Sequence, residues 1–60
     1  MLLQNIKNIC KSKKIPISKM ERDLNFPRGS VFKWGETEPS VEKVKRVADY
    51  LHTTVDKLLQ

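Results

Sequence analysis

The stretch that decides the fold runs from residue 16 to residue 34 and reads PISKMERDLNFPRGSVFKW. Its apolar residues recur three or four positions apart, which predicts one helix from about Ile17 to Leu24 and another over about residues 28 to 34. Asn25 lies between them, and asparagine tolerates the left-handed backbone that ends a helix in a tight turn. We therefore expect two short helices joined by a tight turn.

The helix over residues 28 to 34 is expected to have two different sides. Val31 and Trp34 are three residues apart and face the core together. The opposite side would carry two cations, a glycine and an aromatic ring: Arg28, Gly29, Phe32 and Lys33. Such a surface is suited to entering a charged groove rather than to simple solvation.

The same spacing predicts three further short helices. One covers residues 2 to 13 and is ended by Ile15 and Pro16. Ser40 caps a second, whose apolar stripe is Val41, Val44, Val47, Ala48 and Leu51. Thr53 and Thr54 cap a last helix that contains Val55, Leu58 and Leu59. No segment has a strand pattern, so the chain is predicted to be one all-α domain of five short helices over residues 1–60.

Charge is distributed unevenly along the chain. Residues 1 to 34 hold eight Lys or Arg and two acids, whereas residues 35 to 60 hold four Lys or Arg and five acids. The basic half contains the expected helix pair, which suggests a polyanionic partner, although a solvated lysine-rich surface would give the same counts. No apolar run is long enough to span a membrane and the first ten residues do not form a signal peptide, so we expect a cytoplasmic protein.

The sequence offers little for catalysis or for metal binding. Cys10 and His52 are the only cysteine and histidine, so neither a disulfide within the chain nor a metal cluster is expected, and no cofactor is predicted. Cys10 is expected to be a small core residue. Glu21 is expected to be partly buried near the turn, where it would accept hydrogen bonds from free amides at the start of the next helix or pair with a lysine. An enzyme is not expected.

Taken in order, these segments resemble the helix-turn-helix domain of the phage repressor Cro/CI family (XRE type), in its Gram-positive bacterial and phage variety. The matching runs are IPISKMERDLNF, GSVFKW, PSVEKVKRVADYL and VDKLL, which together cover roughly residues 5 to 59. The resemblance implies a lambda-repressor-like fold whose third helix, over about residues 28–34, lies in the major groove of DNA. The chain departs from the family pattern at Asn25, where a glycine is usual, and at Gly35, Glu36 and Thr37.

The resemblance also implies roles for particular residues. The base-contacting side of the third helix would be formed by Arg28, Gly29, Phe32 and Lys33. Contacts to phosphate would come from Ile17, Ser18, Lys19, Ser30 and Lys43. Glu36 and Glu38 would repel phosphates, which argues against backbone contacts from their loop.

Several of these roles have an alternative. Arg28 can bond guanine O6 and N7 together, or it can clamp a phosphate or remain a solvated cation. Phe32 can meet a thymine methyl group, or it can pack on a loop or a dimer partner. Lys33 suits guanine and phosphate equally. Gly29 either allows a close approach of the backbone or is simply tolerated in a short first turn.

Two functions from different classes are compatible with this sequence. The favoured one is sequence-specific binding of double-stranded DNA by a transcriptional regulator, expected to be a repressor, which would pair weakly and mainly on a palindromic operator. The alternative is a protein interaction module that docks an antirepressor, an antitoxin-type partner or a polymerase subunit through Phe32 and Tyr50. Salt dependence separates them, because DNA affinity falls steeply with ionic strength.

Overall fold

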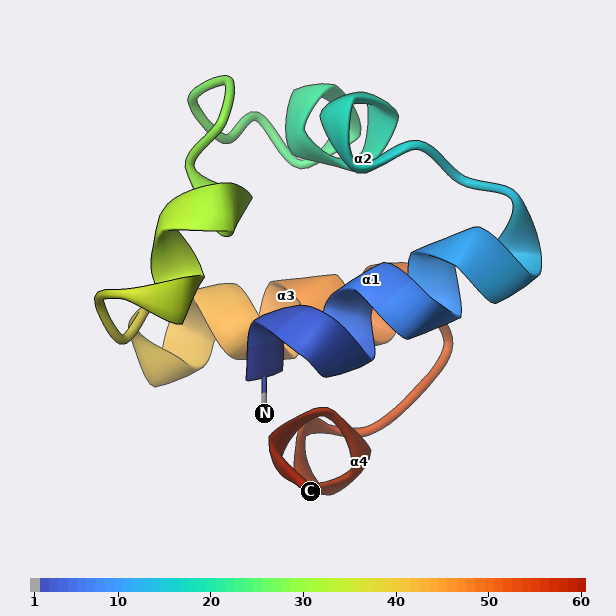
Figure 1. Cartoon of the computed structure of the whole chain (residues 1–60), viewed down its shortest axis with the longest axis vertical. Coiled ribbons are helices and arrows are strands. Elements are labelled where there is room, and N and C mark those ends of the chain that lie inside the picture. Colours follow the sequence, from blue (N-terminus) through green and yellow to red (C-terminus); the bar gives the residue numbers. More distant parts are fainter. Residues whose placement is uncertain (1) are drawn as a thin grey trace.

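The computed structural model describes residues 2–60, and within that range it is all-helical. Four α-helices and one short 3₁₀ helix follow in the order α1 (Leu2–Lys13), α2 (Ile17–Asp23), η1 (Val31–Gly35), α3 (Val41–Tyr50) and α4 (Val55–Leu59). In Figure 1, α2 and α4 lie at opposite sides of the molecule, with α1 between them. α1 packs against both η1 and α4, and α3 packs against α4. The predicted all-α class is confirmed.

The third predicted α-helix is wrong in both type and extent. Residues 28–30 form a turn, in which the Ser30 amide donates to the Pro27 carbonyl over 3.1 Å, and a 3₁₀ helix starts only at Val31. Gly29 has a φ of +82°, which interrupts any right-handed helix at that residue. Arg28 and Gly29 therefore precede η1 and do not share a helical face with Phe32 and Lys33.

Three of the α-helices end in the same way. Lys14 after α1, Asn25 after α2 and His52 after α3 all have a φ near +60°. At each end, the amides of the left-handed residue and of the residue after it donate hydrogen bonds to carbonyls of the last turn of the helix, as in Ile15 to Cys10 and Phe26 to Glu21. This is the pattern of a Schellman motif. The left-handed Asn25 was predicted from the sequence. The left-handed Lys14 and His52 were not predicted.

The N-terminal ends of α3 and α4 agree with the sequence. The Ser40 hydroxyl accepts a hydrogen bond from the Lys43 amide, and the Thr54 hydroxyl accepts one from the Lys57 amide. Each satisfies an amide that has no partner within the helix. These two caps set where α3 and α4 begin.

The core is formed by apolar side chains from every helix. The buried residues are Ile6, Cys10, Met20, Phe26, Val31, Val44, Val47, Ala48, Leu51 and Leu58. Trp34, predicted to be core, is half-buried and packs against this cluster, with its ring edge-on to Phe26 at a centroid distance of 6.0 Å. Val41, predicted to be part of the stripe, is 77% exposed, because it is the first residue of α3 and lies beyond the end of the core.

The two ends of the described chain are held together. The Asn5 side-chain amide donates to the carbonyls of Leu58 (2.8 Å) and Gln60 (2.6 Å), so the first helix closes the C-terminal end of the last one. The start of α1 accordingly lies close to α4 in Figure 1. No helix within residues 2–60 is long and apolar enough to cross a membrane.

The left-handed ends predict an order of stabilities. A residue other than glycine loses about 1–2 kcal/mol of stability in this left-handed conformation, so replacing it with glycine removes that strain. Glycine also loses more backbone freedom on folding, which offsets about 0.5–1 kcal/mol of the stability gained. Lys14→Gly should therefore raise the free energy of unfolding by about 0.5–1 kcal/mol, and Asn25→Gly by less, since asparagine is already tolerant. Urea denaturation measures both. Lys11→Gly, within α1, is the control and should destabilise. Stabilisation by Lys11→Gly, or none by Lys14→Gly, would contradict the assignment.

Candidate nucleic-acid interface

A buried carboxylate joins α2 to the turn that follows it. Glu21 is 1% exposed, and its two oxygens accept hydrogen bonds from the Gly29 amide (2.9 Å) and the Val31 amide (3.0 Å). Of the two partners expected for Glu21, free amides at the start of the next helix or a lysine, the structure shows the amides. Two charge-assisted hydrogen bonds fix both the distance and the angle between α2 and the start of η1.

The role of Gly29 follows from its backbone. A Cβ atom added to Gly29 would meet nothing within 4 Å, so no close packing inside the chain demands a glycine. Glycine is required instead by the φ of +82°, because residues with a Cβ atom rarely adopt this backbone angle. This conformation turns the Gly29 amide toward Glu21 and leaves Arg28 on the outside of the turn.

A groove of about 690 Å³ lies between α2 and the turn. Its exposed cations are Lys19, Arg22 and Arg28, and the Ser18 hydroxyl lies among them. The one carboxylate in the lining, Glu21, is occupied by the two amides. The groove is therefore basic, and three of the residues predicted to contact nucleic acid lie around it: Ser18, Lys19 and Arg28.

The other predicted contact residues lie elsewhere. Phe32 is 51% exposed, and the Lys7 ammonium of α1 lies 5.6 Å from the centre of its ring. Lys33 is exposed on η1, and Lys43 is exposed at the start of α3. None of these three lines the groove.

Two predicted phosphate contacts are only partly exposed. Ile17 is half-buried against the core, and the Ser30 hydroxyl oxygen is buried with no hydrogen-bond partner. A phosphate could meet the Ser30 hydroxyl only if the turn moved. The sequence could not reveal this, because the turn geometry depends on Gly29 and on Glu21 together.

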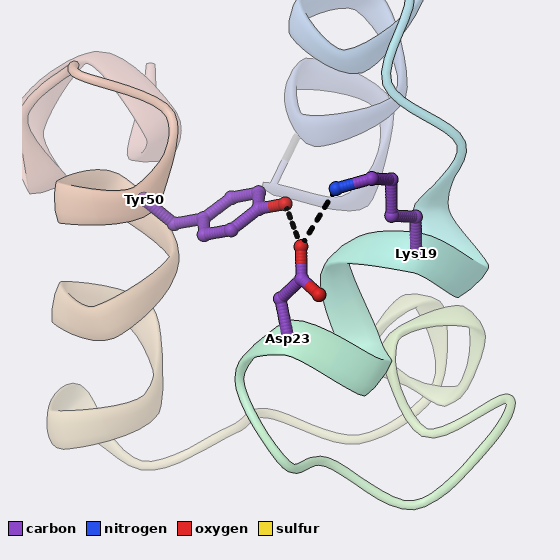
Figure 2. Close-up of polar contacts among 3 residues, drawn as sticks. All are labelled: Lys19, Asp23 and Tyr50. Carbon is purple, nitrogen blue, oxygen red and sulfur yellow. Dashed lines mark hydrogen bonds and ion pairs between the residues drawn. The ribbon is translucent and has the colours of Figure 1, made fainter.

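The orientation of α2 also depends on α3. The Tyr50 hydroxyl donates to Asp23 Oδ2 over 2.6 Å, and the Lys19 ammonium lies 3.0 Å from the same oxygen (Figure 2). The hydrogen bond from Tyr50, followed by that from Lys19, lowers the pKa of Asp23 below its ordinary value of 3.8. The Asp23 hydrogen bond raises the pKa of both Tyr50 and Lys19. The side chain of Lys19 therefore lines the groove while its ammonium group is paired with Asp23.

Arg46 makes a second contact from α3 that sequence reasoning missed. Its guanidinium donates to the Leu24 carbonyl over 2.6 Å and lies 5.1 Å from the centre of the Phe26 ring. It therefore caps the C-terminal end of α2 and covers the aromatic residue of the turn. The sequence showed only that Arg46 lies off the apolar stripe of α3, and this does not identify the group that Arg46 contacts.

Within residues 2–60, no group of three His, Cys, Asp or Glu side chains is arranged to hold a metal ion. Comparisons with models of protein families, with curated proteins and with solved structures found no match to this chain. The assignment of a function therefore depends on the geometry and charge of the groove.

The Glu21 contacts predict a specific loss of stability. Glu21→Gln would place an NH₂ group against one of the two amides, leaving a buried donor unsatisfied at a cost of about 1–3 kcal/mol. The free energy of unfolding in urea should fall by that amount. The matched control is Glu38→Gln, an exposed loop residue, which should change it by less than about 0.5 kcal/mol. Equal effects of the two substitutions would show that Glu21 does not hold the turn.

The Tyr50–Asp23 contact predicts a pH dependence. Because folding lowers the pKa of Asp23, its contribution to stability is present above pH 3.8 and is lost as pH falls through the folded value. Because folding raises the pKa of Tyr50, the contribution of Tyr50 is present below pH 10.0 and is lost as pH rises through its folded value.

Tyr50→Phe should accordingly lower the melting temperature at neutral pH, and the difference from the unaltered chain should shrink in acid and in alkali. Circular dichroism melts across the pH range measure this difference. A difference that stays constant with pH would mean that Tyr50 acts through packing alone.

Proposed function

We propose that this chain binds double-stranded DNA in a sequence-specific manner, as a transcriptional regulator of the Cro/CI helix-turn-helix type, in the cytoplasm of a bacterium or a phage-infected cell. The observation that carries the proposal is the basic groove, in which Lys19, Arg22 and Arg28 surround a depression beside a rigid turn. Clustered cations on one surface are the electrostatic requirement for a partner that carries a phosphate backbone.

The proposed reading element is the turn followed by η1. Arg28 is exposed on the turn, and its planar guanidinium can donate two hydrogen bonds to guanine O6 and N7 in the major groove. Glu21 accepts hydrogen bonds from the amides of Gly29 and Val31, which hold the backbone next to Arg28 in one conformation. The arginine side chain therefore extends from a fixed stretch of backbone. Lys33, exposed on η1, is the second candidate for a base or a phosphate.

Phosphate contacts are assigned to the start of α2. Ser18 and Lys19 are exposed there, and their position beside Arg28 matches a backbone strand that passes along the groove. Phe32 has a weaker case for base contact, because the ammonium group of Lys7 lies against its ring. Glu36 and Glu38 follow η1 and would repel phosphates, so the loop after Gly35 is expected to lie away from the DNA.

The proposed mode of action is binding without a reaction. Occupation of an operator by two copies, paired weakly and mainly on the DNA, would block access to a promoter and give repression. A partner that covers the basic groove would relieve it.

Two substitutions separate base reading from phosphate attraction. Arg28→Ala should cost about 1–3 kcal/mol of binding free energy and relax the preference at one base pair. Lys43, exposed at the start of α3 and outside the groove, is a further phosphate contact in this proposal, so Lys43→Ala should weaken binding to all sequences nearly equally and reduce the salt slope by about one. The binding site is first selected from random duplexes, and affinities are then measured by fluorescence anisotropy over a range of salt concentrations.

Three outcomes bear on the proposal. A selected palindromic consensus with a steep salt dependence would support it. A uniform loss with Arg28→Ala would reassign Arg28 to phosphate and base reading to Lys33. No preference for any duplex over random DNA at low salt would overturn sequence-specific binding.

A further inference from the structure

A second groove, of about 590 Å³, lies between the N-terminus of α1, the loop after η1 and the helices α3 and α4. It shares no lining residue with the basic groove. Its inner surface is apolar, formed by Leu2, Trp34, Val44 and Val55. This groove has no part in the proposed binding of DNA.

The edge of this apolar groove is exposed and hydrophobic. Val41 is 77% exposed and Leu59 is 58% exposed, and both line it. They are two of the three large hydrophobic side chains that are most exposed among residues 2–60; the third, Phe32, lies outside the groove. Apolar side chains gathered at one depression, rather than scattered singly, are typical of an interaction site.

The charge at this edge is opposite to that of the chain. Glu36 and Glu38 line the apolar groove, and no lysine or arginine does. Neither carboxylate forms an ion pair with a cation of the described residues. In a chain with a net charge of +5, two unpaired carboxylates beside an apolar depression select a cationic occupant.

We propose that this apolar groove docks a basic amphipathic segment of another protein. Apolar side chains of that segment would cover Val41, Leu59 and Trp34, and its lysines or arginines would lie against Glu36 and Glu38. An amphipathic helix laid in a hydrophobic groove is a common form of peptide recognition. DNA is excluded from this surface by the same carboxylates.

A second copy of the chain fits this groove less well. A two-fold contact formed by the groove on both copies would gather the carboxylates of both, with no cation from either lining. A contact between the groove and a different surface of a second copy would be head-to-tail and would produce a ring or an open chain of molecules, not a two-fold dimer.

The single tryptophan of the chain makes the proposal measurable. Trp34 lines the apolar groove, so its emission reports on anything that covers it. The probe is a synthetic peptide of about 14 residues, long enough for an induced helix, with leucine and lysine at helical spacing. Two comparison peptides complete the set: one with glutamate in place of lysine, and one with the leucine and lysine order scrambled.

The expected result is a blue shift of Trp34 emission that saturates with the leucine–lysine helix and is weak with the other two peptides. Val41→Gln combined with Leu59→Gln should lower the affinity about tenfold, because it removes apolar area at the edge of the groove. Glu36→Gln combined with Glu38→Gln should lower it about threefold at low salt and flatten its salt dependence.

Matched controls separate the groove from general surface effects. Phe32→Gln removes an exposed apolar residue outside the groove, and Asp49→Asn removes an exposed carboxylate on α3 that does not line it. Both should leave peptide affinity within about twofold of the unaltered chain. Circular dichroism confirms that each variant is folded.

The proposal is overturned by any of three results: no change in Trp34 emission with the leucine–lysine peptide, equal binding of the glutamate peptide, or self-association that Val41→Gln and Leu59→Gln abolish. The last would make a second copy the occupant. Because the assay contains no DNA, its outcome is independent of whether the basic groove binds a duplex.

Discussion

The carboxylate of Glu21 is the constraint on which the arrangement of α2 and η1 depends. A buried carboxylate is costly unless hydrogen bonds replace its hydration, and the amides of Gly29 and Val31 supply those bonds. Since the two amides belong to a turn that cannot continue as an α-helix, the acid also decides how far η1 lies from α2. The hydrogen bonds between Glu21 and the two amides therefore also determine where the exposed side of the turn, including Arg28, lies.

Helix α3 also supports α2, at the C-terminal end of that helix. Tyr50 binds the carboxylate of Asp23, and Arg46 binds the last carbonyl of α2 at Leu24 while covering the ring of Phe26. α2 has only seven residues and would be marginal alone, so these tertiary contacts define its direction. The cations of the basic groove are therefore positioned by a polar framework beneath them as well as by the apolar core.

The sequence by itself determined the local structure. The stop of α1 before Pro16, the caps at Ser40 and Thr54, and the left-handed Asn25 follow from residue types that satisfy or interrupt a helix within a few positions. The buried faces follow from helical periodicity, and the sequence narrowed the partner of Glu21 to the free amides at the start of the next helix or a lysine, of which the structure shows the amides. The uneven charge along the chain indicated one basic surface, though not its outline.

The tertiary structure decided what depends on residues far apart in the chain. The partners Arg46 with Leu24 and Tyr50 with Asp23 are separated by 22 and 27 residues, and no periodicity links them. Periodicity predicted an α-helix over residues 28–34, but the backbone of Gly29 stopped it, since one left-handed residue outweighs the weak preference of a short apolar pattern. The division of the surface into a basic groove and an acidic, apolar one likewise arises only when helices remote in sequence pack together.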